Sequence, residues 1–405
     1  MKKSLKSFVP VEPIGVGGLR IGPKERRYVL EALSSHRLSY GPFSRRFEEM
    51  FAQLHDSRFA VFCNSGTSAL HIALQALKEK YGWKDGDEVI VPAVTFVATS
   101  NIVLHNRMTP VFVDVCPDTY NIDPKLIEKK ITKKTRAIIP VHLMGLPADM
   151  TPIIKIAKKR GLKILEDSCE TMFARCDVRR VGALGDIGCF STYIAHYIVA
   201  GIGGLATTND PDLAVRLRSL MNHGRDSIYM SIDDDANTRG AKFKEIVAKR
   251  FQFQHIGHSF RATELEAALG LAQLENWKNT LKTRQAIAHE YLNGLSDLQE
   301  ELQLPVIPPG RDHVFMLFPL VMRKRPKKDL INFLERHKIE TRDLLPLINQ
   351  PVYRKMFGNI DKDYPVAQRL NSHGFYIGCH QYISRQERDY VIATIHKFFK
   401  KRVRR

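Results

Sequence analysis

The sequence predicts an α/β fold with a largely parallel sheet, followed by a smaller α+β unit. Short β-rich runs alternate with helical stretches between about residues 59 and 208, and most of these runs are apolar throughout. A new strand and a new helix begin after about residue 295. A chain of 405 residues suits one large domain and one smaller domain.

Seven segments have the composition of buried strands. Strands that helices cover on both faces are apolar along their whole length, whereas half-exposed strands alternate apolar and polar side chains. The first type predominates here, so we expect a parallel sheet between two layers of helices. The segments are FAVFC (59–63), EVIVP (88–92), PVFVDV (110–115), RAIIPVH (136–142), LKILED (162–167), DIGCFSTY (186–193) and GGLATT (203–208).

The second half of the chain changes in character. The polar stretch 226–250 predicts a loop, and residues 263–295 carry apolar side chains at the spacing of a helix long enough to join two domains. A strand at 313–322 and a helix at 327–339 then open the smaller unit. The expected division is an N-terminal segment over 1–24, a large domain over 25–290 and a small domain over 291–405.

Composition restricts the class of protein. No apolar run reaches the roughly eighteen residues of a membrane helix, and the N-terminus lacks the apolar core of a signal peptide, so we expect no membrane span and a cytoplasmic location. The six cysteines form no CxxC pair and predict reduced thiols. The net charge of +19 suits an anionic partner such as a diphosphate-linked substrate. No nucleic-acid-binding motif accompanies the charge, so we expect no nucleic-acid partner.

A hydroxyl-rich segment follows the first strand candidate. Ser65, Gly66, Thr67 and Ser68 open a helical stretch. N–H groups at a helix start, adjacent hydroxyls and a glycine that permits close approach can form a phosphate cradle. Serine and threonine are also ordinary helix N-caps. Alone, the segment therefore suits a phosphate site or a simple helix start.

Other polar and aromatic candidates lie where ligands of open α/β sheets bind. Glu166 and Asp167 end one strand, where a carboxylate can pair with a protonated pyridine nitrogen or cap a loop. Phe96, which follows another strand, can stack on a flat cofactor or belong to the core. Ser191, in a later strand, is a candidate donor to a phosphate.

The order and spacing of the motifs carry more information than any one motif. They are NSGTSALHIALQAL (64–77), DEVIVPAVTFVATSNIV (87–103), PVFVDVCPDTYNID (110–123), IIPVHLMGLPADM (138–150), ILEDSCE (164–170), VGALGDIGCFSTY (181–193), GIGGLATTND (201–210), NHGRD (222–226) and RATELEAALGLAQLE (261–275). With them the chain resembles the DegT/DnrJ/EryC1/StrS family of sugar aminotransferases from about residue 12 to 395. The resemblance implies a fold-type-I pyridoxal-phosphate (PLP) transferase: a large domain with a mainly parallel seven-stranded sheet, a smaller α+β C-terminal domain, and a homodimer with active sites at the subunit interface.

The resemblance also implies how the cofactor phosphate is bound. Gly66, Thr67 and Ser191 match phosphate-binding positions of the family, and Ser65 belongs to the same cradle. Ser259 stands where the family has an asparagine that resembles a phosphate contact across the subunit interface. A serine can still donate one hydrogen bond there, although its reach is shorter.

Three residues match positions around the cofactor ring. Phe96 matches the stacking aromatic residue, Asp167 the partner of the pyridine nitrogen, and Glu170 a Gln or Glu near the ring. The substrate class that the resemblance implies is a nucleotide-linked 4-keto-6-deoxy sugar.

The chain departs from the family at the cofactor-binding lysine. Family aminotransferases read approximately FSFYPTKNLTTGEGG, and this chain reads FSTYIAHYIVAGIGG over 190–204, which places His196 at the lysine position. No lysine occurs between Lys163 and Lys242, so a small misalignment does not restore one. Histidine forms no stable imine with PLP, but it moves protons near neutral pH. The sequence therefore predicts pyridoxamine 5'-phosphate that is not covalently bound, and dehydration with His196 as base rather than transamination.

Two branches of the family carry histidine at this position, and both are sugar 3-dehydratases. One, like GDP-4-keto-6-deoxymannose 3-dehydratase, needs only the pyridoxamine cofactor and an amino donor such as glutamate. The other adds a [2Fe-2S] cluster held by four cysteines, but no cysteine lies between Cys189 and Cys379 here, so we expect no metal. The expected role is deoxysugar synthesis for a surface polysaccharide such as O-antigen. Two alternatives stay open: a sugar aminotransferase that works without the lysine, and an inactive homologue with a regulatory or scaffold role.

Overall fold

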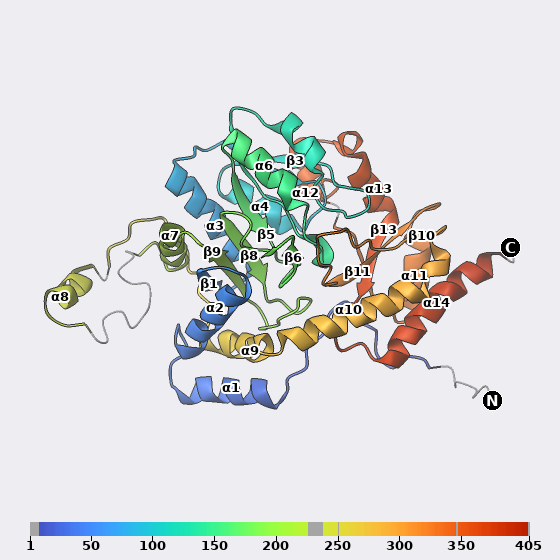
Figure 1. Ribbon diagram of the computed structural model, residues 1–405, viewed down its shortest axis with the longest axis horizontal. Helices are drawn as coiled ribbons and strands as arrows, with labels where there is room; N and C mark the ends of the chain where they lie inside the picture. The colour runs from blue at the N-terminus through green and yellow to red at the C-terminus, as the bar shows by residue number, and fades with distance from the viewer. Residues whose placement is uncertain (1–7, 226–237, 250, 346, 404–405) are drawn as a thin grey trace.

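A seven-stranded sheet and a four-stranded sheet organise the computed structural model, which describes residues 8–225, 238–249, 251–345 and 347–403 (Figure 1). In the large sheet the strand order is β1-β9-β8-β5-β4-β2-β3. Strand β9 is antiparallel to β1 and β8, and every other neighbouring pair is parallel. The predicted mainly parallel, seven-stranded sheet is confirmed. Its strands are β1 (Phe59–Cys63), β2 (Glu88–Pro92), β3 (Thr109–Val113), β4 (Thr135–Ile138), β5 (Lys163–Asp167), β8 (Ile187–Ser191) and β9 (Gly204–Thr208).

Helices surround the large sheet, which lies at the centre of Figure 1. One apolar cluster packs α2, α3 and α7 against it, and another joins Ile90, Val113 and Ile138 of the sheet to Met150 and Ile153 of α6. Helical cover on both faces explains why the strands are apolar throughout. The helices of this part are α1 (Pro23–Ser34), α2 (Pro42–Leu54), α3 (Gly66–Tyr81), α4 (Val97–His105), α5 (Pro124–Ile127), α6 (Met150–Arg160) and α7 (Pro211–Met221), and a short β6 (Arg175–Cys176) pairs with β7 (Arg179–Arg180).

The small sheet is antiparallel and has a core of its own. Its order is β10-β11-β13-β12. Ile14 of the N-terminal segment joins this core and pairs in parallel with Ile339. The elements are β10 (Leu302–Gln303), β11 (Leu317–Met322), β12 (Thr341–Asp343), β13 (Gly374–Gly378), α11 (Lys328–Arg336), α12 (Pro351–Phe357), α13 (Pro365–His373) and α14 (Arg385–Val403).

Two predictions for the middle of the chain need correction. The loop expected over 226–250 is wrong for its second part, because Gly240–Lys249 form helix α8; residues 226–237 and 250 lie outside the described residues. The single helix expected over 263–295 is two helices, α9 (Glu264–Leu274) and α10 (Trp277–Gly294). The break falls at Asn276 (φ −108°, ψ 12°), after which Trp277 stacks on Phe173 at 4.8 Å. Helix α10 still joins the two sheets, as predicted (Figure 1).

No helix in the described ranges is both long and apolar enough to cross a bilayer.

Candidate active site

A pocket of about 430 Å³ lies at the carboxyl ends of β5 and β8 and at the starts of α3 and α4. The small sheet closes it with residues such as Met316 and Tyr376. The topology explains the position, because the carboxyl ends of the parallel strands meet at one edge of a sheet. Eight of the nine candidate residues line this pocket: Ser65, Gly66, Thr67, Phe96, Asp167, Glu170, Ser191 and His196.

The start of α3 forms one wall. Ser65 is its N-cap, and its hydroxyl accepts the Ser68 N–H at 3.0 Å. The amides of Gly66 and Thr67 belong to the first turn and have no partner within the helix. A Cβ at Gly66 would lie 2.8 Å from Cβ of Ser191, so only glycine lets the helix start approach strand β8 this closely. Helix-start N–H groups beside hydroxyls suit a phosphate.

The two neighbouring acids of β5 point to opposite sides of the sheet. Glu166 is fully buried and accepts the N–H groups of Gly182, Leu184 and Gly185 at 2.6 to 2.8 Å, so it holds a turn in place. Asp167 faces the pocket. Of the two acids, only Asp167 therefore lies where it could contact a group bound in the pocket.

Asp167 is a buried carboxylate that a neighbouring hydroxyl orients. It accepts a hydrogen bond from Thr99 Oγ1 at 2.7 Å and one from the Cys169 N–H at 3.1 Å. Burial is the main influence on its pKa and raises it, although both hydrogen bonds oppose the shift. A cationic partner in the pocket would restore the charged carboxylate.

Glu170 is the second acid of the pocket. Its Oε2 accepts the Met144 N–H at 3.0 Å. Burial, with a smaller contribution from the charge of Asp167, raises the pKa of Glu170 to about 7. The two carboxyl groups therefore differ in environment, and Glu170 changes protonation near neutral pH.

His196 lies in the loop after β8, at the pocket wall. Its Nδ1 is 3.0 Å from the carbonyl oxygen of Tyr193. A carbonyl only accepts, so the neutral ring carries its proton on Nδ1 and Nε2 keeps a free lone pair. Burial, followed by the charge of Arg284, lowers the pKa of His196 to about 4. At neutral pH His196 is thus an uncharged ring whose Nε2 can accept a proton.

Two of the candidate residues, Phe96 and Ser259, are exposed. Phe96, at the N-cap of α4, is 57% exposed, which gives its ring a free face beside the pocket. Ser259 is exposed and lies outside this pocket; its Oγ accepts a hydrogen bond from Arg261 at 3.0 Å. Ser259 therefore reaches no group bound in the pocket of its own chain.

Several residues of the site escaped the sequence analysis. Thr99 orients Asp167, and its spacing of four residues from Thr95 was a signal that could have been used, since the two hydroxyls lie 2.8 Å apart. Arg284 and Tyr376 come from distant segments, and no local pattern marks them.

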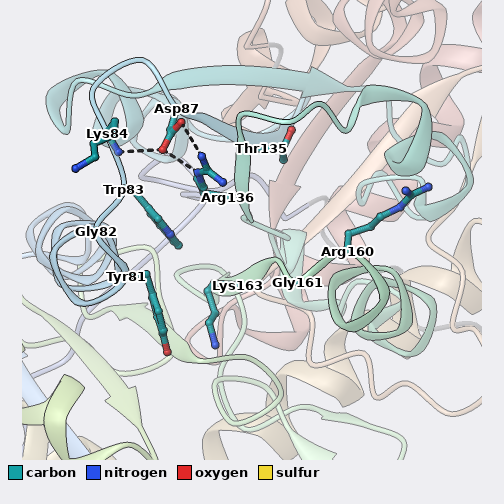
Figure 2. Close-up of a pocket in the computed structure, with 10 residues that line it drawn as sticks. All are labelled: Tyr81, Gly82, Trp83, Lys84, Asp87, Thr135, Arg136, Arg160, Gly161 and Lys163. Atoms are coloured by element: carbon teal, nitrogen blue, oxygen red, sulfur yellow. Dashed lines mark hydrogen bonds and ion pairs between the residues drawn. The ribbon is translucent and has the colours of Figure 1, made fainter.

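A second hollow, of about 420 Å³, lies at the opposite edge of the large sheet and contains none of the candidate residues (Figure 2). Tyr81, Trp83 and Lys163 converge there. Its cations are largely neutralised by acids of the chain: Arg136 pairs with Asp87, Lys163 with Asp186 and Arg160 with Glu128. The balanced charge makes this hollow a poor match for an anionic ligand.

The fold and the pocket together define the class of protein. A model of the DegT/DnrJ/EryC1/StrS aminotransferase family matches residues 20–396, so the chain belongs to this family of PLP-dependent sugar enzymes. It is 33% identical to a GDP-perosamine synthase of Caulobacter vibrioides, over 94% of this chain and 97% of the relative. It is 32% identical to a dTDP-4-dehydro-2,6-dideoxy-D-glucose 3-dehydratase of Saccharopolyspora spinosa, over 96% and 87%. A solved GDP-4-keto-6-deoxy-D-mannose-3-dehydratase of E. coli with bound hydrated PLP superposes with a TM-score of 0.86 at 25% identity, covering 95% of this chain and all of that one.

The pocket has groups that fit each part of the cofactor. Gly66 lets the start of α3 approach β8, and the amides of this helix start suit the phosphate. The buried Asp167 suits a pyridinium nitrogen. The exposed ring of Phe96 can stack on the cofactor ring. No lysine is among the described residues that line the pocket. The described residues of the site therefore suit a pyridoxal-type cofactor.

Proposed function

We propose that this protein is a pyridoxamine-phosphate-dependent 3-dehydratase of a nucleotide-linked 4-keto-6-deoxy sugar. The observation that supports it is the histidine at the lysine position: His196 lines a pocket whose described lining has no lysine. When bound, the cofactor supplies an amine for the sugar ketone and a ring that accepts electrons. Its binding is noncovalent, through Ser65, Gly66, Thr67 and Ser191 at the phosphate.

His196 is the proposed base. The Tyr193 carbonyl fixes the ring proton on Nδ1, so Nε2 would take a proton from the methylene carbon of the bound cofactor and give it to the departing C3 hydroxyl, which leaves as water. Asp167 would keep a proton on the pyridine nitrogen, and the hydrogen bond from Thr99 orients its carboxylate. Phe96 would stack on one face of the ring. Glutamate is the proposed amino donor that regenerates the amine form of the cofactor.

The deciding experiment analyses the product by mass. The protein is incubated with pyridoxamine phosphate, glutamate and either the GDP- or the dTDP-linked 4-keto-6-deoxy sugar. Loss of the C3 oxygen is expected, whereas a stable amino sugar would establish the aminotransferase alternative instead. Purified protein with neither cofactor absorbance nor turnover would establish an inactive homologue.

We further propose that the protein works as a homodimer. Ser259 does not line the pocket of its own chain, so the phosphate contact that the family resemblance implies for it would need the pocket of a second copy. Phe96, Tyr193 and Ile202, all lining the pocket, are more than half exposed, and a partner would cover them. Light scattering should give twice the chain mass of 46.3 kDa. A monomer at micromolar concentration contradicts this proposal.

The proposed setting is cytoplasmic synthesis of a deoxysugar for a surface polysaccharide such as O-antigen.

A further inference from the structure

Arg284, in α10, is a fully buried cation without an acidic partner. No carboxylate of the described residues pairs with it. Its guanidinium donates to Gln381 Oε1 at 2.9 Å, to the Met316 carbonyl at 2.9 Å, to the Cys379 carbonyl at 3.5 Å and to the His196 carbonyl at 3.0 Å. Neutral acceptors thus hold a full positive charge inside the protein.

This arrangement is costly and has one specific geometric result. Burial lowers the pKa of Arg284, and the Tyr197 ring, 4.9 Å from the guanidinium carbon, offsets part of the desolvation. An apolar side chain would fill the same space without that cost. The planar guanidinium donates to three backbone carbonyls at once: Met316, just before β11, Cys379, just after β13, and His196. A lysine has no such fork, so only arginine joins α10 to all three segments.

The loop that carries His196 is exposed before this residue and buried after it, where Tyr197 and Ile198 belong to the core. Tyr193 and Ile194 are exposed, at 53% and 43%. Beyond the loop's own turn, Val199 N–H donates to Gln273 at 2.9 Å and the Tyr197 hydroxyl donates to the Glu170 carbonyl at 3.4 Å. At His196 itself, the contact from another helix is the hydrogen bond from Arg284 to its carbonyl.

We propose that Arg284 is a positioning residue that fixes the backbone of His196 at the pocket. The proposal rests on the proposed function of His196 as the base. Other titratable groups also face the two residues, but the charge effect on His196 comes from Arg284. Those groups are Asp167, Glu170, Tyr193 and Tyr376 around the pocket, and Tyr197, Cys379, His380 and Tyr382 around Arg284.

The test compares Arg284→Gln with Arg284→Lys, and uses Arg388→Gln as the matched control. Arg388 also bonds α10, through Glu290 at 2.6 Å, but it has no contact with the His196 loop. The first measurement is the ring NMR titration of His196 in protein without cofactor, assigned by its loss in His196→Asn. Arg284→Gln should raise the midpoint from about 4 by only part of the difference to 6.5, because burial, the larger influence on this pKa, remains, whereas Arg388→Gln should leave the midpoint unchanged.

The second measurement is turnover. Arg284→Gln should lower kcat roughly 100-fold with little change in KM, because the base is displaced while substrate contacts remain. Arg284→Lys retains the charge but not the fork, so it should keep the low midpoint and still lose kcat. If Arg284→Gln does not fold, Gln381→Ala, which frees one arm of the fork, tests the same loss of kcat.

The two proposals fail in distinguishable ways. An unchanged His196 titration in folded Arg284→Gln overturns the positioning role, even if the wild type dehydrates the sugar. A shifted titration in a protein that never releases the C3 hydroxyl supports the role of Arg284 and overturns the proposed reaction.

Discussion

At the scale of single residues, the proposed reaction depends on the ring of His196. His196→Asn should retain the cofactor, because the phosphate cradle and Asp167 are untouched, and should lower turnover roughly 10²- to 10⁴-fold, the usual contribution of a general base. Turnover and retained cofactor absorbance are measured on the same sample. The exposed His36→Asn serves as the control. Normal turnover in His196→Asn would remove His196 from the mechanism.

Restoring the lysine gives a complementary prediction. Because His196 lines the pocket, His196→Lys should place an amine within reach of PLP. Borohydride reduction followed by intact-mass analysis should then show covalently attached cofactor in the variant and none in the wild type. Covalent attachment in the wild type would contradict noncovalent binding.

Glu170 should make stability depend on pH. Its folded pKa of about 7 lies above the ordinary 4.5, so its stabilising contribution is fully present below pH 4.5 and is lost as pH rises through 7. Glu170→Gln retains an acceptor for the Met144 N–H and cannot ionise. Urea unfolding should therefore show a variant that gains stability relative to wild type between pH 4.5 and 7.5. A constant difference across this range would mean that Glu170 titrates normally.

The two acids of β5 show what sequence can and cannot predict about a site. Both were candidates from their strand-end position, and Asp167 was chosen by resemblance alone. Alternation along a strand required that only one of them face the pocket. Which face the pocket occupied depended on the packing of the small sheet, and no local pattern encodes that packing.

At the scale of elements, a buried carboxylate of α9 caps the start of α2. Glu264 is 1% exposed and accepts the N–H groups of Gly41, Phe43 and Ser44 at 2.8 to 2.9 Å, together with the Ser44 hydroxyl. A negative group at a helix start accepts from the unpaired N–H donors there and interacts favourably with the positive end of the helix dipole. This contact joins two elements that lie more than 200 residues apart in sequence.

Glu264→Gln should therefore destabilise the fold. One oxygen is replaced by an NH₂ group that faces N–H donors, so we expect a loss of about 1–3 kcal/mol in the free energy of unfolding. Glu266→Gln is the matched control, because Glu266 caps α9 itself at a half-buried position and glutamine is accepted in a capping box. Equal stability of the two variants would show that Glu264 does not hold α2.

The elements themselves were predictable to different degrees. All seven strands of the large sheet were found, since burial on both faces leaves a strong apolar signal. Helix α8 was missed because much of its surface is exposed and its apolar Phe243 and Val247 did not outweigh a polar neighbourhood. The break at Asn276 was missed because the contact between Trp277 and Phe173 that follows it comes from a distant segment.

At the scale of the whole molecule, the site exists only where both sheets meet. Asp167 and Ser191 come from the large sheet, while Met316, Leu345 and Tyr376 arrive from the small-sheet half of the chain. Strand order and helix cover followed from local patterns. The approach of the second sheet depends on long-range packing, so the sequence identified the residues that line the large-sheet side of the pocket and not those of the opposite wall.

Two buried histidines should make the whole molecule sensitive to acid. Burial lowers the pKa of His55 and of His313 to about 3, so each binds a proton in the unfolded chain at a higher pH than in the folded one. In the core, His55 Nδ1 donates to the Phe51 carbonyl at 3.0 Å and Nε2 accepts the Phe173 N–H at 3.2 Å. A second ring proton would point at that N–H donor.

The sign follows from the direction of these shifts. Above pH 6.5 both states leave the rings neutral and the contribution is complete; it is lost as pH falls from 6.5 through about 3, because the unfolded state binds more protons. Urea midpoints should fall over that range, with each histidine contributing on the order of a few kcal/mol at most. His55→Gln should be less stable at pH 7.5 by about 1–3 kcal/mol, since Gln satisfies the two backbone groups less well. It should also show a shallower fall with acid, whereas the exposed His36→Asn should keep the wild-type slope; equal slopes for all three proteins would place the acid sensitivity elsewhere.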